Sequence, residues 1–199
     1  MENKNYVITI GREFGSCGME IGKIVAKKLG IKVYYKELVE MAAERMGMRT
    51  AVLMDIDETF ANNLQTYITT PKKRTLQDTL FETEAEIIKE LAEKESCVIV
   101  GHCASYVLRE FKNTLNLFVY APYGVRFNHL LNEYQLTREA TENMIESVDK
   151  ARHAYYKHYT KANRGSRDNR QIMFDSSVLG VEKTAEVVEH IVKLKFDLE

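Results

Sequence analysis

The chain has 199 residues, of which 45% are hydrophobic, and its 28 Lys+Arg against 29 Asp+Glu leave a formal net charge of −1. This length supports one well-buried core and is short for two domains. The balanced charge argues against a protein drawn to nucleic acid or to an anionic membrane. No apolar run approaches the ~20 residues that cross a bilayer, and the first residues show no leader pattern, so we expect a cytoplasmic protein.

The first informative segment is an apolar strand over 6–11 that runs into a glycine-rich turn and then into a helical pattern over 18–29. Glycines let such a turn form without Cβ clashes, and the first amides of the helix stay free to face an anion. A tight turn that binds nothing is the simpler alternative. We expect phosphate binding, and the predicted residues of this cradle are Gly15, Ser16, Cys17 and Gly18.

The turn departs from two known phosphate-binding patterns. A Walker loop carries Lys and then Ser or Thr after its last glycine, whereas this chain has Gly18 and Met19 at those places. The spacing also differs from the Gly-x-Gly-x-x-Gly of dinucleotide sites, and Tyr35 stands where a ribose-binding acid is expected. The sequence therefore predicts a phosphate cradle with a degenerate Walker loop and leaves its enzymatic chemistry open.

Further strands and helices alternate along the rest of the chain. The expected strands are 31–35, 96–101, 115–121 and 171–175, and the expected helices are 36–46, 76–94, 123–134, 138–159 and 181–195. Near-continuous apolar strands separated by helices predict a parallel α/β sheet that is covered on both faces and binds ligands beyond the carboxyl ends of its strands. Residues 47–75 show weak periodicity, and we interpret them as an insertion that covers the site.

Several segments carry a longer pattern: Ile-Thr-Ile-Gly-Arg-Glu-Phe-Gly-Ser at 8–16, Val-Ile-Val-Gly at 98–101, Val-Asp-Lys-x-Arg at 148–152 and Ser-x-x-Leu-Gly-x-Glu-Lys at 176–183. Together they resemble the cytidylate kinase-like family, a branch of the P-loop nucleoside monophosphate kinases. The resemblance implies a single domain with the three-layer P-loop NTPase-like fold. It also implies a five-stranded parallel sheet of order 2-3-1-4-5 with helices on both faces, and a mobile basic lid at 150–170.

Four positions depart from the family's usual residues. The family usually has Gly at 17, Arg at 19, Asp at 35 and Arg at 102, and this chain has Cys17, Met19, Tyr35 and His102. In cytidylate kinases the arginine that matches His102 grips the acceptor phosphate, a bidentate contact that histidine cannot reproduce. Two cations and one carboxylate of the expected site are therefore missing.

The resemblance also implies roles for individual residues. Arg12 would belong to the phosphate loop, and the expected catalytic residues are Lys150, Arg152 and His102. The expected acceptor-binding residues are Lys36, His102 and Tyr155. Solvated surface charge is the alternative for the lid cations. Helix capping or packing is the alternative for His102, and packing is the alternative for Tyr155.

ATP and Mg²⁺ are the cofactors that the resemblance implies. Glu20 is the metal candidate of the sequence, with a helix-dipole carboxylate as its alternative, and Asp175 is a weaker candidate that also fits a helix cap. The expected function is ATP-dependent phosphoryl transfer to a (d)CMP-like acceptor, with nucleotides as the only expected partners. The alternative is a catalytically weak or inactive nucleotide- or anion-binding sensor or interaction protein on the same fold.

Overall fold

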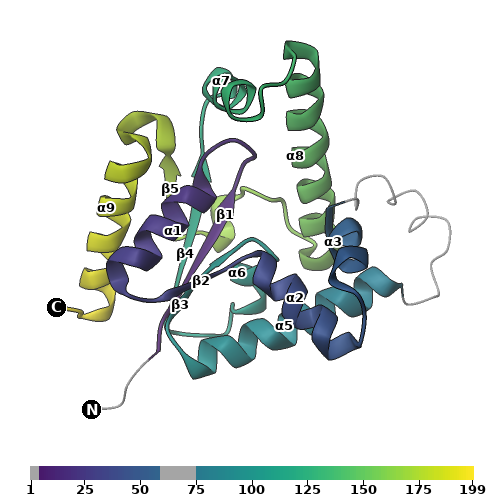
Figure 1. The fold of residues 1–199 in the computed structure, drawn as a ribbon. Coiled ribbons are helices and arrows are strands. Elements are labelled where there is room, and N and C mark those ends of the chain that lie inside the picture. Colours follow the sequence, from purple (N-terminus) through teal and green to yellow (C-terminus); the bar gives the residue numbers. More distant parts are fainter. Residues whose placement is uncertain (1–4, 59–74) are drawn as a thin grey trace.

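The computed structural model describes residues 5–58 and 75–199, and these residues form one parallel sheet flanked by helices (Figure 1). The sheet has the strand order β2-β3-β1-β4-β5. Its strands are β1 (Val7–Arg12), β2 (Lys32–Tyr34), β3 (Cys97–Val100), β4 (Thr114–Tyr120) and β5 (Ile172–Asp175). The predicted fold class and strand order are therefore confirmed.

Helices cover both faces of the sheet. The helices are α1 (Gly18–Leu29), α2 (Lys36–Met46), α3 (Thr50–Glu58), α5 (Leu76–Lys94), α6 (Ala104–Val107), α7 (Tyr123–Tyr134), α8 (Arg138–Thr160) and α9 (Ser176–Phe196), with a 3-10 turn η1 at Arg167–Asn169. Helices α1 and α9 pack together on one face, and α2 and α5 pack together on the other. Helices α7 and α8 rise beyond the carboxyl ends of the strands (Figure 1).

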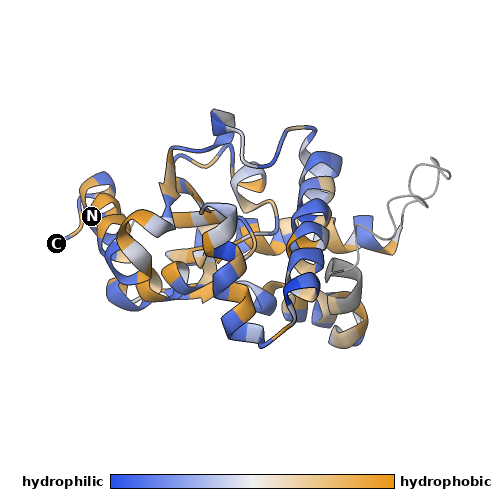
Figure 2. Cartoon of the chain, turned by 90° about the horizontal axis from the view of Figure 1, so that it is seen from above, coloured by the Kyte–Doolittle hydropathy of each residue, from blue (hydrophilic) through white to orange (hydrophobic). Residues whose placement is uncertain are grey.

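The alternation of side chains along the strands divides the core into two halves. Ile8 and Val98 are fully buried on the side of α1 and α9, whereas Val7 and Ile99 belong to the cluster under α2 and α5. Burial of each such side chain contributes about 1.5–3 kcal/mol. Figure 2 shows hydrophobic and hydrophilic residues alternating along the helices, as expected for helices with one buried face.

Two details differ from the sequence prediction. The short helices α3 and α6 were not expected, and residues 59–74 of the predicted insertion lie outside the described residues. Helix α9 begins at Ser176 rather than at 181, but Gly180 has a non-helical φ of 76°, so the regular helix resumes where it was expected. Within 5–58 and 75–199, no helix is both long and apolar enough to cross a bilayer.

Candidate functional site

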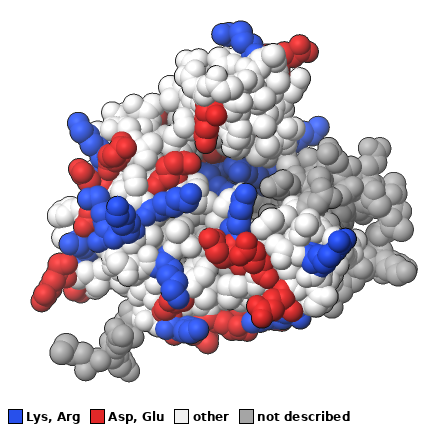
Figure 3. All heavy atoms as spheres, viewed as in Figure 1, with Lys and Arg blue, Asp and Glu red and all other residues white. Residues whose placement is uncertain are grey.

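A cavity of about 710 Å³ lies at the carboxyl ends of the strands. Its wall combines the turns that follow β1, β2 and β3 with side chains from α7, α8 and the segment before β5. Figure 3 shows Lys and Arg atoms inside the hollow beneath α7. The cavity therefore occupies the place at which an open parallel sheet binds its ligands, as the sequence predicts.

Residues 12–18, the phosphate loop, need glycine at two positions. Gly15 has a φ of 76°, and a Cβ there would lie 2.7 Å from Leu130 of α7. A Cβ on Gly18 would lie 2.6 Å from the Cβ of Arg12. Cys17 also adopts a left-handed conformation, with a φ of 61°, and caps α1. Because non-glycine residues pay about 1–2 kcal/mol for that conformation, the turn is held by the surrounding structure.

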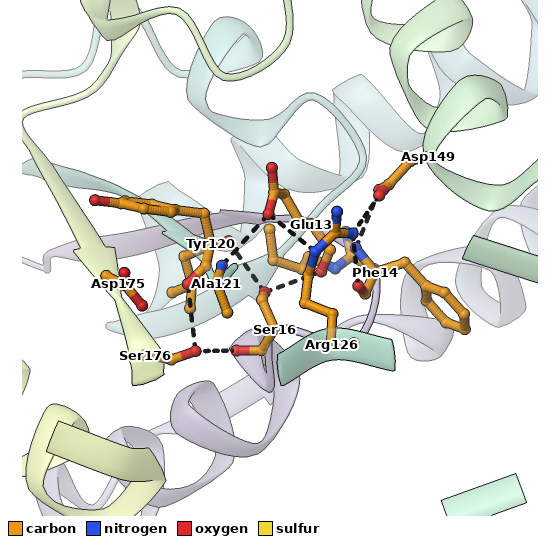
Figure 4. Close-up of polar contacts among 12 residues, drawn as sticks. Glu13, Phe14, Ser16, Tyr120, Ala121, Arg126, Asp149, Asp175 and Ser176 are labelled. Carbon is orange, nitrogen blue, oxygen red and sulfur yellow. Dashed lines mark hydrogen bonds and ion pairs between the residues drawn. The ribbon is translucent and has the colours of Figure 1, made fainter. Parts of the chain in front are cut away.

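The outer side of the phosphate loop is bonded to β4 and α9 (Figure 4). The Ser16 hydroxyl donates to the Val119 carbonyl at 3.0 Å, and the Ser176 hydroxyl donates to the Ser16 carbonyl at 2.9 Å. The Glu13 carboxylate accepts from the Ala121 amide at 3.3 Å. These bonds fix the loop to β4, to the segment after it and to α9.

Helices α7 and α8 hold the loop at Phe14 (Figure 4). Asp149 of α8 accepts the Phe14 amide at 3.0 Å, and Arg126 of α7 donates to the Phe14 carbonyl at 3.0 Å. Arg126 also donates to Asp149 at 2.6 Å and lies 3.3 Å from the Glu13 carboxylate. The backbone N–H and the backbone carbonyl of Phe14 are thus both bonded to the Arg126–Asp149 ion pair, which joins the two helices.

This arrangement leaves amides of the loop for a ligand. Among the described residues, no group accepts a hydrogen bond from the amides of Gly15, Cys17 or Gly18, and all three residues line the cavity. The Ser16 amide is 3.4 Å from the Glu13 carbonyl, at the limit of a hydrogen bond. Free amides at the start of a helix attract anions. The loop therefore fits a phosphate group by its backbone alone.

Arginines add positive charge to the cavity wall. Four of them line it, namely Arg12, Arg152, Arg164 and Arg170. Arg164 donates to the Arg12 carbonyl and lies 3.3 Å from the Asp149 carboxylate. Burial, together with the nearby charge of Arg152, lowers the pKa of the Arg164 guanidinium to about 10, while Asp149 acts in the opposite direction. The cavity thus holds positive charge that its own carboxylates balance incompletely, which favours an anionic ligand.

The predicted site residues divide between the cavity wall and its surroundings. Lys36, Arg152 and Tyr155 line the cavity together with Arg12, Gly15, Cys17 and Gly18. Ser16 is buried beneath the loop, and Lys150 is exposed on α8 away from the cavity wall. The structure thus places Arg152 in the cavity wall and Lys150 outside it, and the catalytic roles of both stay predictions.

His102 lines the cavity wall, yet its imidazole is turned toward α5. His102 Nδ1 lies 3.2 Å from the Glu84 carboxylate, and the two side chains are only 3% and 1% exposed. The Tyr35 ring lies 5.7 Å from the imidazole on its other side. This surrounding supports the packing alternative for His102, because the imidazole lies against a buried carboxylate.

The acidic residues offer little to a metal ion. Asp175 accepts from the Ser177 amide at 2.9 Å and from its hydroxyl at 2.6 Å, so it caps α9. Glu20 is exposed at the cavity rim. In the part of the chain that the structure describes, no three His, Cys, Asp or Glu side chains gather as metal ligands. Since Mg²⁺ is often held by one or two carboxylates plus substrate phosphates, Glu20 fits only as a single carboxylate beside a phosphate-bound ion.

Sequence reasoning assigned no role to Arg126 and Arg170, and it used Asp149 only as part of the pattern at 148–152. Arg126 lies in the first turn of α7, the helix after β4, and Arg170 lies two residues before β5. Proximity to strand ends was the available signal, because ligand-binding residues gather there in parallel sheets. Nothing local in the sequence shows that Asp149 bonds to Phe14, which is 135 residues away.

Comparisons with known proteins agree with this geometry. A family model described as "Cytidylate kinase-like family" matches residues 7–178. A solved structure of an uncharacterized protein from Eubacterium ventriosum ATCC 27560 superimposes with a TM-score of 0.71 at 22% identity, covering 95% of this chain and 99% of that one. No protein of curated function matches the sequence.

Two kinase structures share the fold at lower identity. Shikimate kinase from Bacteroides thetaiotaomicron has a TM-score of 0.57 at 14% identity, covering 94% of this chain and 98% of that one. The APS kinase of Mycobacterium tuberculosis, solved with AMPPNP and APS, has a TM-score of 0.52 at 12% identity, with 96% and 98% covered. These likenesses show the fold of P-loop kinases.

Proposed function

Because the chain belongs to the cytidylate kinase-like family, we propose that it binds a nucleotide with its phosphates on the phosphate loop and transfers a phosphoryl group from ATP to a (d)CMP-like acceptor. The proposal depends on the backbone amides of Gly15, Cys17 and Gly18. These three residues line the cavity, and no described residue accepts a hydrogen bond from their amides. An anion that receives several backbone N–H groups at a helix start is bound without any side chain.

The surrounding cations suit the charge of a phosphoryl group in transfer. Such a reaction spreads negative charge over the oxygens of the group, and catalysis consists largely of positioning and charge stabilisation. The loop amides would hold the donor phosphates, while Arg152 and Arg164 would stabilise the charge from the α8 side. Lys36, at the first turn of α2, would face the acceptor. ATP would supply the phosphoryl group and Mg²⁺ would neutralise part of its charge, with Glu20 as the available carboxylate.

A second candidate function is nucleotide binding without efficient transfer. At the position of the Walker hydroxyl, Met19 packs against the apolar cluster of α1 and α9 and offers neither a hydroxyl nor a charge. Gly18 likewise supplies no ammonium group. Loss of one contact to a transferring group typically costs ~10²–10³ in rate, so two losses would leave a binding protein that senses nucleotides.

The test separates binding from turnover. Thermal unfolding is measured with ATP, ADP and CMP, each with and without Mg²⁺, and ADP formation is measured with ATP plus CMP. A ligand at 100 times its Kd stabilises the fold by about 2.7 kcal/mol, which is readily detected. CMP-dependent turnover near ~1–100 s⁻¹ supports the kinase. Binding without turnover supports the sensor, and the absence of any nucleotide effect overturns both.

A further inference from the structure

Arg170 is fixed in the cavity wall by groups from three elements. Its Nη1 donates to the Ser105 hydroxyl at 2.5 Å. Its guanidinium carbon lies 5.4 Å from the ring centres of both Phe118 and Tyr156. Stacking on two aromatic faces and a hydrogen bond together leave the guanidinium little freedom. A cation held in this way is oriented before any ligand arrives.

One edge of this guanidinium remains available. The Arg170 Nε is buried and has no hydrogen-bond partner among residues 5–58 and 75–199. A buried donor without a partner is rare in native proteins and calls for an explanation. Because Nη1 is bonded to Ser105, the edge formed by Nε and Nη2 presents two parallel donors, the geometry that pairs with two oxygens of a phosphate or carboxylate.

The neighbours of Arg170 show on which side of the cavity this edge of the guanidinium lies. A Cβ on Gly11, at the end of the central strand β1, would lie 3.2 Å from Arg170 Nη2, and Ser105 belongs to α6, after β3. The phosphate loop leans the other way, since Gly15 lies against Leu130 of α7. Arg170 therefore lies over the end of β1, with Phe118 of β4 on one side, and reaches the β3 side through its bond to Ser105, across from the phosphate loop.

On the β3 side of the cavity, the side chain of residue 102 is turned away from the acceptor position. The His102 imidazole lies against the Glu84 carboxylate of α5. Arg12 also lies on this side, with its guanidinium across Gly101 and 4.9 Å from the centre of the Tyr35 ring. An anionic acceptor bound beyond β3 would meet the guanidinium of Arg170 rather than an imidazole.

We propose that Arg170 binds the phosphate of the acceptor through Nε and Nη2. The inference rests on the proposed function for the presence of a phosphorylated acceptor. It predicts that loss of Arg170 weakens acceptor binding but not donor binding, because the proposed function places the donor phosphates on the loop amides. Loss of a charged hydrogen-bonding partner should weaken acceptor binding by about 10- to 100-fold.

The test measures the Kd of CMP and of ATP separately, by calorimetric titration of the full chain. Arg170→Met should weaken CMP binding by about 10- to 100-fold and change ATP binding by less than about threefold. Arg170→Lys should give an intermediate loss, because one ammonium cannot supply two parallel donors. Ser105→Ala should give a smaller loss of CMP affinity, since it frees the guanidinium without removing its charge.

Arg167→Met is the matched control, because Arg167 is exposed in η1 three residues away. It should leave both affinities unchanged. If Arg170→Met binds CMP as tightly as the wild type does, the inference is overturned but the proposed function is not. The same holds if the variant loses CMP and ATP affinity equally. Wild-type protein that binds ATP but not CMP overturns the acceptor class and the inference, and binding of neither overturns the proposed function as well. If Arg170→Met does not fold, unchanged CMP binding by Arg170→Lys and Ser105→Ala overturns the inference.

Discussion

The phosphate loop and the β3–α6 turn, residues 101–105, are both strand-end turns with left-handed residues, yet they present different groups to the cavity. The loop has such residues at Gly15 and Cys17, and the β3–α6 turn has three in succession at 101–103. The loop lines the cavity with backbone amides. The β3–α6 turn instead directs its His102 side chain onto the buried Glu84 carboxylate.

This difference shows which substitutions a binding site tolerates. Backbone amides are present whatever side chain a residue carries, so the loop keeps its cradle although Cys17 and Met19 replace the family's usual residues. A contact made by a side chain is lost with that side chain, and His102 therefore changes the chemistry of the β3–α6 turn. The comparison predicts that changes at His102 of the turn lower stability without weakening ATP binding, whereas changes in the loop backbone weaken ATP binding as well.

His102→Ala should have the largest effect on stability. We expect it to lower the free energy of unfolding by about 3 kcal/mol, because it removes the imidazole from beside a buried carboxylate. The affinity for ATP should change by less than about threefold, since the donor phosphates are bound by amides. Urea unfolding and ATP titration measure the two quantities. His153→Ala, at an exposed histidine of α8, is the control and should change neither. A loss of ATP affinity without a loss of stability would break the comparison.

Gly15→Ala should lower both the free energy of unfolding and the affinity for ATP. The affinity for ATP is the measurement that tests the role of the loop. The new Cβ would meet Leu130 at 2.7 Å in a left-handed residue, and we expect a loss of about 2 kcal/mol in the free energy of unfolding. ATP binding should weaken by about tenfold, which corresponds to about 1.4 kcal/mol.

Gly30→Ala controls for the conformational strain in Gly15→Ala. Gly30 has a φ of 64° at the end of α1, and nothing lies within 4 Å of a Cβ there. Its substitution should cost about 1 kcal/mol of stability and leave ATP binding unchanged. Equal ATP affinities of the two variants would mean that the loop does not hold the phosphates.

Cys17→Gly should have the smallest effect and the opposite sign. Glycine relieves the left-handed strain at a φ of 61° but adds freedom to the unfolded chain, so the net gain in stability should not exceed about 1 kcal/mol. The ATP affinity should be retained because the amide remains. Cys17→Ala keeps the strain and should show no gain. Weaker ATP binding by Cys17→Gly would show that the thiol itself contributes to the site.

The fold was more accessible to sequence reasoning than the site. The strand, glycine turn and helix over 6–29 carry local signals, and the five strands are apolar runs, so the fold class followed from the pattern. The strand order followed from the resemblance alone. Helices α3 and α6 were missed because they have nine and four residues and span too few turns for a clear period.

The site depends on contacts between distant residues. Phe14 meets Asp149, and Ser105 meets Arg170 at a separation of 65 residues. The environment of His102 is set by Glu84, one of several acidic residues on an amphipathic helix and the one that happens to be buried. Periodicity can indicate which face of a helix is inward, but it does not show which polar side chains a neighbouring turn will meet.

The bond between Asp149 and the Phe14 amide has a mechanical consequence for α8. The helix is anchored to the phosphate loop at this point, and Arg126 and Arg164 brace the same carboxylate. Rigid rotation of the whole of α8 would distort the loop, so α8 is expected to stay in place at Asp149. Any closure of residues 150–170 over a ligand therefore has to pivot beyond Asp149, and it leaves the phosphate loop in place only if the contacts of Arg164 to Asp149 and to the Arg12 carbonyl can break.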